Sequence, residues 1–355
     1  FVRTTQVPTD SGTTDADTGT FGFTGLDVFA VGTLGEKLSF LITFTPGLAE
    51  SGFQTAPSNL DSDLESAFIG FHDIAGTTFA NVRVGKHAPD LPIDEHRTLT
   101  LTTGYNVYHF HPAGSTVTWE PGSNQSGVEF YGHDELSRFR YSVSLFNEGG
   151  SAFFSKNFVS NPVLWGHIQG TKYLDAGILQ AVRIGAFGSV GWHPTTSEVL
   201  TPAGGTPAPV QGTGSNMKEH YRYGGEAHLQ LLSLVNPLTI SGVVMGGSED
   251  AALIPGASQD AHFLGWFVEG VYTITPRLSL LGRYEMISTT QQGDPAAPQS
   301  AGDLKAWTAT IRHTFELTSR TEAALHLEFS RVGIDAGDGT TPATYSALIG
   351  FDFAL

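Results

Sequence analysis

Apolar and polar residues alternate one by one along many segments of this chain. In 137–147 the large apolar side chains share one face: Phe139, Tyr141, Val143 and Leu145. The residues between them are charged or small and polar: Arg138, Arg140, Ser142 and Ser144. Because successive side chains of a strand point to opposite sides of a sheet, this period of two predicts a β-strand with one apolar and one polar face.

The same pattern recurs along the chain and predicts an all-β protein with about 16 strands, in a range of about 14 to 18. The expected strands are 1–7, 20–32, 37–46, 64–73, 77–87, 125–133, 137–147, 163–173, 177–190, 219–232, 236–248, 261–273, 276–289, 303–316, 319–332 and 343–355. Many have about 10 to 13 residues, whereas strands of globular proteins most often have about 5 or 6. The alternation changes phase near Thr24 and Gly25, which predicts a β-bulge within 20–32.

Two kinds of connection alternate between these strands. The tight turns are Gly32–Glu36, Ile74–Thr77, Asp134–Leu136, Leu174–Ala176, Ser233–Val235, Ile274–Pro276 and Leu317–Thr318. Long polar loops separate the hairpins, as at 47–63, 191–218, 249–260 and 290–302. A soluble β-sandwich shows the same residue alternation, but it has no reason to segregate short and long connections. The pattern is typical of a transmembrane antiparallel β-barrel with short periplasmic turns and long extracellular loops.

Composition agrees with a membrane barrel and excludes several other classes. Hydrophobic residues make up 40% of the chain, and no run approaches the about 18 apolar residues of a helical membrane span. The absence of cysteine excludes disulfides, thiolate metal sites and haem attachment through C-x-x-C-H. A formal net charge of −17 argues against a nucleic-acid partner. Because the chain opens at Phe1 inside an expected strand, we interpret it as a mature chain after signal-peptide removal.

The last expected strand carries a more specific signal. Apolar residues occupy alternate positions there: Ala347, Ile349, Phe351, Phe353 and Leu355. With Gly350, this ending resembles the carboxy-terminal assembly signal of bacterial outer-membrane barrels, although Leu348 stands where that signal usually has a polar residue. In architecture the whole chain resembles the bacterial general porins. The resemblance implies one barrel domain over 1–355 in the bacterial outer membrane, in contact with lipid, without a cofactor and compatible with a homotrimer.

The longest connection, 88–125, is the third on the long-loop side. In general porins the third loop folds into the barrel and narrows the channel, so the resemblance implies a constriction here. The acidic residues of this loop are Asp90, Asp94 and Glu95. The arginines expected on the inner face of the strands are Arg83, Arg138, Arg140, Arg183, Arg222, Arg283, Arg312 and Arg320. Opposed rows of charge across a narrow aqueous path would orient polar solutes and select ions; the alternative is that each is an ordinary solvated charge.

Part of this connection is too apolar for a loop in free water. Residues 98–102 and 105–111 must either pack inside the barrel or form an extra hairpin, which would raise the strand count to about 18. The stretch Val84–Leu101 also resembles barrels that accompany multihaem cytochromes in outer-membrane electron conduits. That resemblance implies a multihaem cytochrome as a partner.

The chain has 13 histidines, of which His109 and His111 share a face while His87 and His96 flank the acidic turn. With a third ligand such a pair could bind zinc, nickel or copper, but hydrogen-bonded histidines in a wet interior are the more common case. No nucleophile elbow, phosphate loop or haem motif is present, so we predict no enzymatic activity. The sequence favours a porin for passive diffusion of small hydrophilic solutes or ions. The alternative is a structural barrel that sheathes or anchors a multihaem cytochrome.

Overall fold

The computed structural model describes residues 2–6, 18–21, 28–44, 64–95, 99–101, 104–148, 161–174, 177–195, 199–200, 208–209, 217–233, 236–291, 302–318, 321–335 and 343–354. Within these ranges, 17 strands form one large sheet, and β11 (Val199–Leu200) with β12 (Ala208–Pro209) forms a separate two-stranded sheet. Short 3-10 helices occur at η2 (Asn106–His109) and η3 (Ala251–Leu253). None of the described helices is long and apolar enough to cross a lipid bilayer.

The strands of the large sheet are β1 (Val2–Gln6), β2 (Thr18–Phe21), β3 (Val28–Thr33), β4 (Leu38–Phe44), β5 (Leu64–Phe71), β6 (Asn81–His87), β7 (Gln125–His133), β8 (Phe139–Asn147), β9 (Pro162–Tyr173), β10 (Leu179–Pro194), β13 (Met217–Ser233), β14 (Asn236–Glu249), β15 (Ala261–Thr275), β16 (Leu278–Thr289), β17 (Leu304–Thr318), β18 (Thr321–Ile334) and β19 (Ala343–Ala354). Every expected strand segment overlaps at least one of them, and 20–32 overlaps both β2 and β3. Residues 22–27, with the expected bulge, lie outside the described residues.

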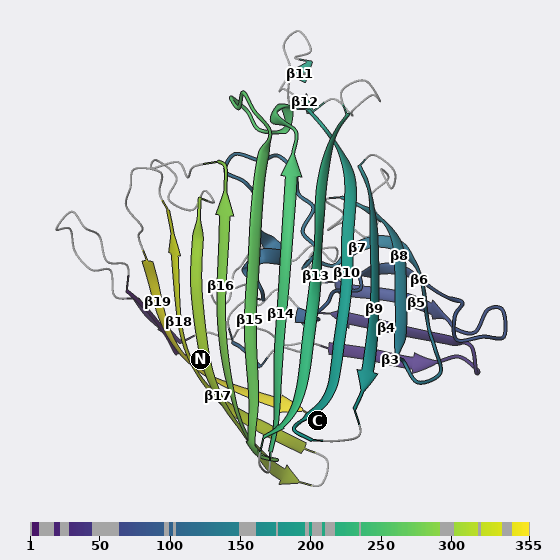
Figure 1. Cartoon of the computed structure of the whole chain (residues 1–355), viewed down its shortest axis with the longest axis vertical. Coiled ribbons are helices and arrows are strands. Elements are labelled where there is room, and N and C mark those ends of the chain that lie inside the picture. Colours follow the sequence, from purple (N-terminus) through teal and green to yellow (C-terminus); the bar gives the residue numbers. More distant parts are fainter. Residues whose placement is uncertain are drawn as a thin grey trace.

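The pairing order bends this sheet back on itself. Neighbouring strands pair antiparallel from β3 to β10 and from β13 to β19, and β10 pairs with β13. β19 then pairs with β1, with Val2 opposite Ile349, and β1 pairs with β2. The described ladder therefore runs from β3 through β19 and β1 to β2 and forms an antiparallel β-barrel (Figure 1). Among the described residues β2 and β3 are the two ends of this ladder, and every strand between them is paired on both sides. The predicted fold class is confirmed.

The tight turns gather at one end of the barrel. In Figure 1 the turn that joins β15 to β16 lies at the lower end, whereas the η3 connection lies at the upper end. At the turn between β7 and β8, Phe139 N donates to Asp134 Oδ1 at 2.9 Å, and Ser137 adopts a positive φ of 52°. The side chain of Asp134 thus satisfies an amide of this turn, as aspartate often does. We call this end the turn rim.

Large apolar side chains of the strands point outward. On β8, Leu145 is 50% exposed while Ser142 is 1% exposed, and on β17 Ile311 is 43% exposed while Thr310 is 2% exposed. A soluble barrel or sandwich would bury the apolar face and expose the polar one. The observed arrangement is the reverse, as expected for a barrel whose outer face meets lipid hydrocarbon.

These two faces predict opposite responses to charge. Leu145→Arg and Ile311→Arg should each cost about 2 to 4 kcal/mol of insertion free energy, because the new charge faces the bilayer. Gln230→Arg and Thr239→Arg, whose side chains line a water-accessible cavity inside the barrel, should cost clearly less than the outward positions. Folding into vesicles of short-chain lipid, followed by urea titration, measures the difference. Equal costs for inward and outward positions would contradict the assignment of the faces.

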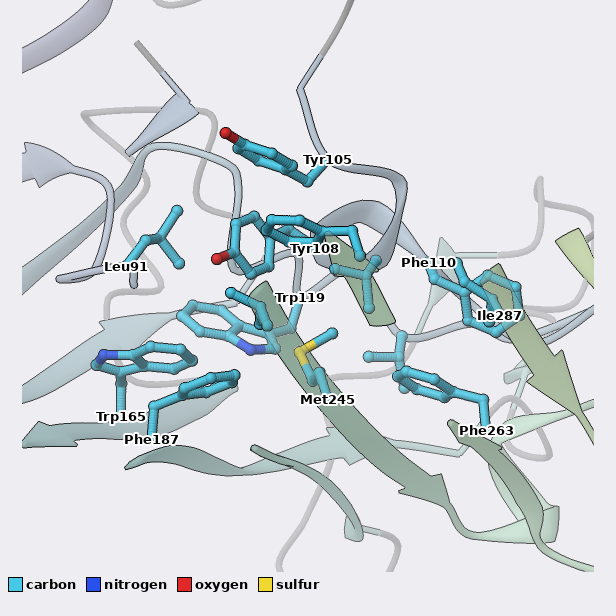
Figure 2. Close-up of a cluster of buried hydrophobic side chains, with 14 of the residues drawn as sticks. Leu91, Tyr105, Tyr108, Phe110, Trp119, Trp165, Phe187, Met245, Phe263 and Ile287 are labelled. Carbon is cyan, nitrogen blue, oxygen red and sulfur yellow. The ribbon is translucent and has the colours of Figure 1, made fainter. Parts of the chain in front are cut away.

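The described part of the connection between β6 and β7 (88–95, 99–101 and 104–124) lies inside the barrel, and we call it the inner loop. Its aromatic side chains pack against inward-facing side chains of the strands in one buried cluster (Figure 2). Tyr105 stacks on Phe267 of β15 with 4.2 Å between ring centroids, and Phe110 lies 4.9 Å from Phe263 of the same strand. The described part of 98–111 forms η2 and this packing, not a further hairpin. Packing inside the barrel thereby shields its apolar residues from water, and no additional strands are needed.

Candidate functional site

Arg283 on β16 fixes one side of the inner loop to the barrel wall. Its Nε donates to Glu269 Oε2 at 2.9 Å, and its Nη1 donates to the carbonyl of Gly104 at 3.1 Å. The guanidinium also lies 4.0 Å from the ring centroid of Tyr105, whose hydroxyl donates to Glu269 at 3.2 Å. A buried arginine with several hydrogen bonds and an aromatic face holds its partners in one geometry. The loop is therefore firmly attached to β15 and β16.

Buried carboxylates hold further parts of the same loop. Three loop amides donate to them: Leu101 to Glu328 at 2.5 Å, Asn106 to Glu285 at 2.8 Å and Thr118 to Glu148 at 2.6 Å. Glu148, just after β8, also lies 2.8 Å from His193 Nδ1 and 3.4 Å from His220 Nε2. Burial alone would raise the pKa of Glu148, but the two histidines lower it to about 2. Glu148 is therefore a carboxylate at neutral pH and an acceptor for the loop.

His109 joins the two arms of the inner loop. Its Nε2 lies 2.8 Å from Glu95 Oε2 and its Nδ1 lies 2.9 Å from Glu120 Oε2. Burial acts to lower the pKa of His109, but hydrogen bonds and charge from Glu120 and Glu95 outweigh it and raise the pKa to about 10. His109 is thus an imidazolium at neutral pH. It links a residue before η2 to a residue after η2, so the loop behaves as one folded unit.

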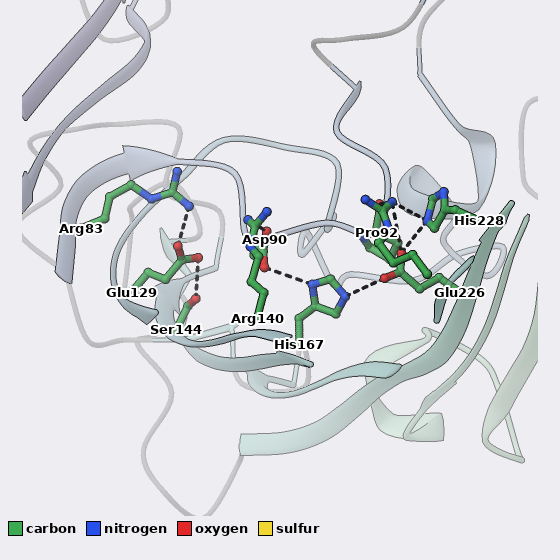
Figure 3. Close-up of polar contacts among 10 residues, drawn as sticks. Arg83, Asp90, Pro92, Glu129, Arg140, Ser144, His167, Glu226 and His228 are labelled. Carbon is green, nitrogen blue, oxygen red and sulfur yellow. Dashed lines mark hydrogen bonds and ion pairs between the residues drawn. The ribbon is translucent and has the colours of Figure 1, made fainter. Parts of the chain in front are cut away.

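The first arm of the inner loop, residues 88–95, faces strands β8 to β13. There Asp90 forms an ion pair with Arg140 and lies 3.1 Å from Nδ1 of His167 (Figure 3). Nε2 of the same histidine lies 3.2 Å from Glu226 on β13. Arg183 on β10 donates to the carbonyl of Pro92 at 2.9 Å. These contacts hold the arm at a short distance from the wall rather than against it over its full length.

A cavity of about 500 Å³ lies between this arm and the wall. A second cavity of about 460 Å³ lies nearer the turn rim, where His133 and Ser137 line it. Four residues line both cavities: Arg140, Gln169, Arg183 and His228. Cavities that share lining residues adjoin, so the two lie one after the other from the inner loop toward the turn rim, and we call them together the passage. We call the four shared residues the junction.

Strand register places the junction residues at one level of the barrel. Arg140 on β8 is opposite Gln169 on β9, and Arg183 on β10 is opposite His228 on β13. Arg140 and Arg183 keep 44% and 32% of their side chains exposed, so both guanidiniums are accessible to a solute in the passage. The junction thus presents fixed positive charge to water on one side of the barrel.

The structure separates the sequence-predicted residues into several groups. Those that line the passage are Arg83, Asp90, Asp94, Arg140 and Arg183. Glu95 turns into the loop toward His109, and Arg222 and Arg283 are buried in ion pairs with Glu249 and Glu269. Arg138 is exposed at the turn rim beside Asp134, and Nε of Arg312 lies 3.1 Å from His326. Arg320 lies outside the described residues. A role in conduction stays a prediction for all of them.

Sequence reasoning did not single out His167, Glu226, His228 or Glu269. Each occupies an inward-facing position of an alternating strand, and this position is the sequence feature that could have identified it. For the histidines, the described residues contain no group of three or more His, Asp or Glu side chains that could hold a metal ion. His87 packs edge-on against Phe146, with 5.1 Å between ring centroids, and His96 lies outside the described residues.

The chain is similar in fold to solved outer-membrane proteins. An anion-selective porin from Comamonas acidovorans matches with a TM-score of 0.56 and 13% identity over 99% of this chain and 96% of the porin. The outer membrane channel DcaP of Acinetobacter baumannii matches with a TM-score of 0.54 and 10% identity over 99% and 94%. The trimer form of OmpT from Vibrio cholerae matches with a TM-score of 0.50 and 12% identity over 99% and 96%.

These similarities define the class of fold, a porin-like outer-membrane β-barrel that spans almost the whole chain. No protein-family model matches the sequence, and no curated protein matches it. At such low identities the shared property is the arrangement of strands, whereas function depends on the particular residues inside the barrel.

Proposed function

We propose that this protein is a channel of the bacterial outer membrane through which small hydrophilic solutes and ions diffuse passively, without catalysis. The pair of adjoining cavities beside the inner loop carries the proposal, because together they lead from the loop toward the turn rim. The apolar outer face suits a lipid bilayer. A porin and a channel among the proteins of similar fold support the same proposal.

In this proposal the inner loop is the constriction of the channel. Its aromatic residues fill the interior next to β14 to β17, where Tyr105 and Phe110 pack. The open volume remains along the first arm of the inner loop, where Asp90 and Asp94 on the loop line the same cavity as Arg140 and Arg183 on the wall. Solutes would pass between these fixed charges, which select ions by their local field.

The proposal predicts a current and a defined change in its selectivity. Protein inserted into planar bilayers should give discrete single-channel steps in KCl. The double variant Asp90→Asn, Asp94→Asn should shift the reversal potential toward anions, because the arginines then lack opposing charge. The shift should shrink at high salt, since the Debye length falls to about 3 Å at 1 M. Glu316→Gln, at an exposed position near the end of β17, removes one charge outside the passage and is the control.

The contrasting reading is a structural barrel that sheathes or anchors a multihaem cytochrome. It predicts correctly folded protein with no steps in the bilayer and a haem-bearing chain that copurifies from native membranes. Discrete steps in the absence of any second chain would contradict it. The trimer form of one protein of similar fold leads us to propose a homotrimer, which native mass spectrometry in detergent would detect.

A further inference from the structure

The inner face of the barrel carries apolar residues that the packing of the inner loop does not use. Leu41 on β4, Phe68 on β5, Val271 on β15 and Leu281 on β16 occupy inward positions and line the larger cavity. None of the four belongs to the buried cluster formed by the inner loop. Apolar surface next to water is unfavourable by about 25 cal/mol per Å², and a channel for simple ions has no need of it.

The inner loop adds to this apolar surface. Leu91, Pro92, Ile93 and Leu99 line the same cavity from the loop side. The cavity therefore has an apolar part made by the loop arm and strands β4, β5, β15 and β16, and a basic part at the junction. Such a lining matches a molecule that is itself divided into an apolar and an anionic part.

Charge within the passage becomes more positive toward the turn rim. Three carboxylates line the larger cavity: Asp90, which pairs with Arg140, Glu269, which pairs with Arg283, and Asp94. Among the described residues that line the smaller cavity there is no carboxylate, while Arg140 and Arg183 both line it. Each of these arginines already faces one carboxylate of the protein, Arg140 that of Asp90 and Arg183 that of Glu226 at 3.9 Å. A solute carboxylate at the junction therefore meets the exposed parts of two guanidiniums, whose several donors allow each to bind a second carboxylate.

We propose that the passage binds small amphipathic organic anions, with the carboxylate at Arg140 and Arg183 and the apolar group against Leu41, Phe68 and the first arm of the inner loop. This inference rests on the proposed channel function and names its preferred solutes: aliphatic or aromatic monocarboxylates rather than sugars or inorganic ions. The cavity volumes of about 500 and about 460 Å³ are sufficient for such molecules.

The test uses hexanoate, acetate and hexylammonium as probes on the full-length protein in planar bilayers. Hexanoate should reduce the KCl current in a concentration-dependent manner. Acetate, which has the charge without the chain, and hexylammonium, which has the chain with the opposite charge, should each need at least about tenfold higher concentration. Equilibrium dialysis of labelled hexanoate against detergent-solubilised protein gives a second readout that needs no current.

Two variants separate the two halves of the site. Arg140→Gln with Arg183→Gln should raise the half-blocking concentration of hexanoate at least about tenfold, and Arg140→Lys with Arg183→Lys should restore part of the block. Phe68→Ser should reduce the preference for hexanoate over acetate and leave acetate itself unchanged. Arg277→Gln, at an exposed turn outside the passage, is the matched control. Migration of unboiled and boiled protein on gels verifies that each variant forms a barrel.

The outcomes distinguish this proposal from the channel function itself. Current that is equally sensitive to hexanoate and acetate would overturn the amphipathic site while the channel stands. If no organic anion affects the current and dialysis detects no binding, the amphipathic site is likewise overturned while the channel stands. Binding of hexanoate without any current would support the site and overturn the channel. Loss of the block in the Arg277→Gln control would also contradict the assignment to the junction.

Discussion

A variant that lacks residues 99–119 is expected to conduct at least about twofold more current per channel than the unaltered protein, because the side chains that fill the interior are gone. Tyr105, Tyr108 and Trp119 are fully buried in the barrel, and each would be replaced by water. The measurement is single-channel conductance in KCl at one voltage. The same variant should unfold more easily, since Phe263 and Phe267 on the wall lose their packing partners Phe110 and Tyr105.

Shortening a different connection serves as the control for this deletion. Residues 201–207 join β11 to β12, which form a sheet of their own apart from the large one. Deleting part of that segment should leave the conductance close to that of the unaltered protein. If removing 99–119 leaves the conductance unchanged in a protein that still forms a barrel, the inner loop does not restrict the conducting path.

The variant Arg283→Met is expected to lose about 3 to 5 kcal/mol of unfolding free energy, because it leaves buried carboxylates without their counter-charge. Glu269 lies 2.9 Å and Glu285 3.5 Å from this guanidinium, and the arginine side chain is only 1% exposed. Because Arg283 also holds Tyr105 and Gly104, the loop should loosen and the open-channel current should become noisier. Urea titration in vesicles, followed by tryptophan fluorescence, measures the loss.

An exposed ion pair provides the comparison for Arg283. Arg277 lies 3.3 Å from Glu316 at a turn, and both side chains are about 60% exposed. Arg277→Met should therefore cost at most about 1 kcal/mol, since water solvates both charges. Adding Glu269→Gln and Glu285→Gln to Arg283→Met should recover part of the stability, because no unpaired charge then remains. A cost for Arg283→Met no larger than that for Arg277→Met would show that this pair does not anchor the loop.

The strands and their faces could be predicted because alternation is a local property of the sequence. The residues next to Leu145 and Ser142 in the sequence are enough to assign these two side chains to opposite faces of the strand, and the structure confirms both assignments. Segment 105–111 was likewise recognisable as too apolar for water, although the choice between packing and a hairpin required the tertiary structure. The strand ends were less well defined: Arg138 was assigned to the inner face, but β8 begins at Phe139 and Arg138 belongs to the turn.

The functions of individual charges could not be read in this way. Arg183 and Arg283 both occupy polar, inward-facing positions of alternating strands, and nothing nearby in the sequence distinguishes their environments. Arg283 is buried because the inner loop crosses the interior at β15 and β16, whereas Arg183 stays partly exposed because the loop arm leaves a cavity there. His167 was missed for the same reason, since its partners Asp90 and Glu226 come from distant parts of the chain.

The ladder between β1 and β19 has a consequence for how the protein is assembled. It pairs Val2 with Ile349, residues from opposite ends of the described chain, so that contact is the last that a growing polypeptide can make. Contacts between residues far apart in sequence slow folding, because much chain entropy is lost before they form. Until β19 reaches β1, both strands offer open edges and the apolar outer face lacks lipid. The chain is therefore most exposed to aggregation before this ladder forms, because an unpaired strand edge can pair with another chain.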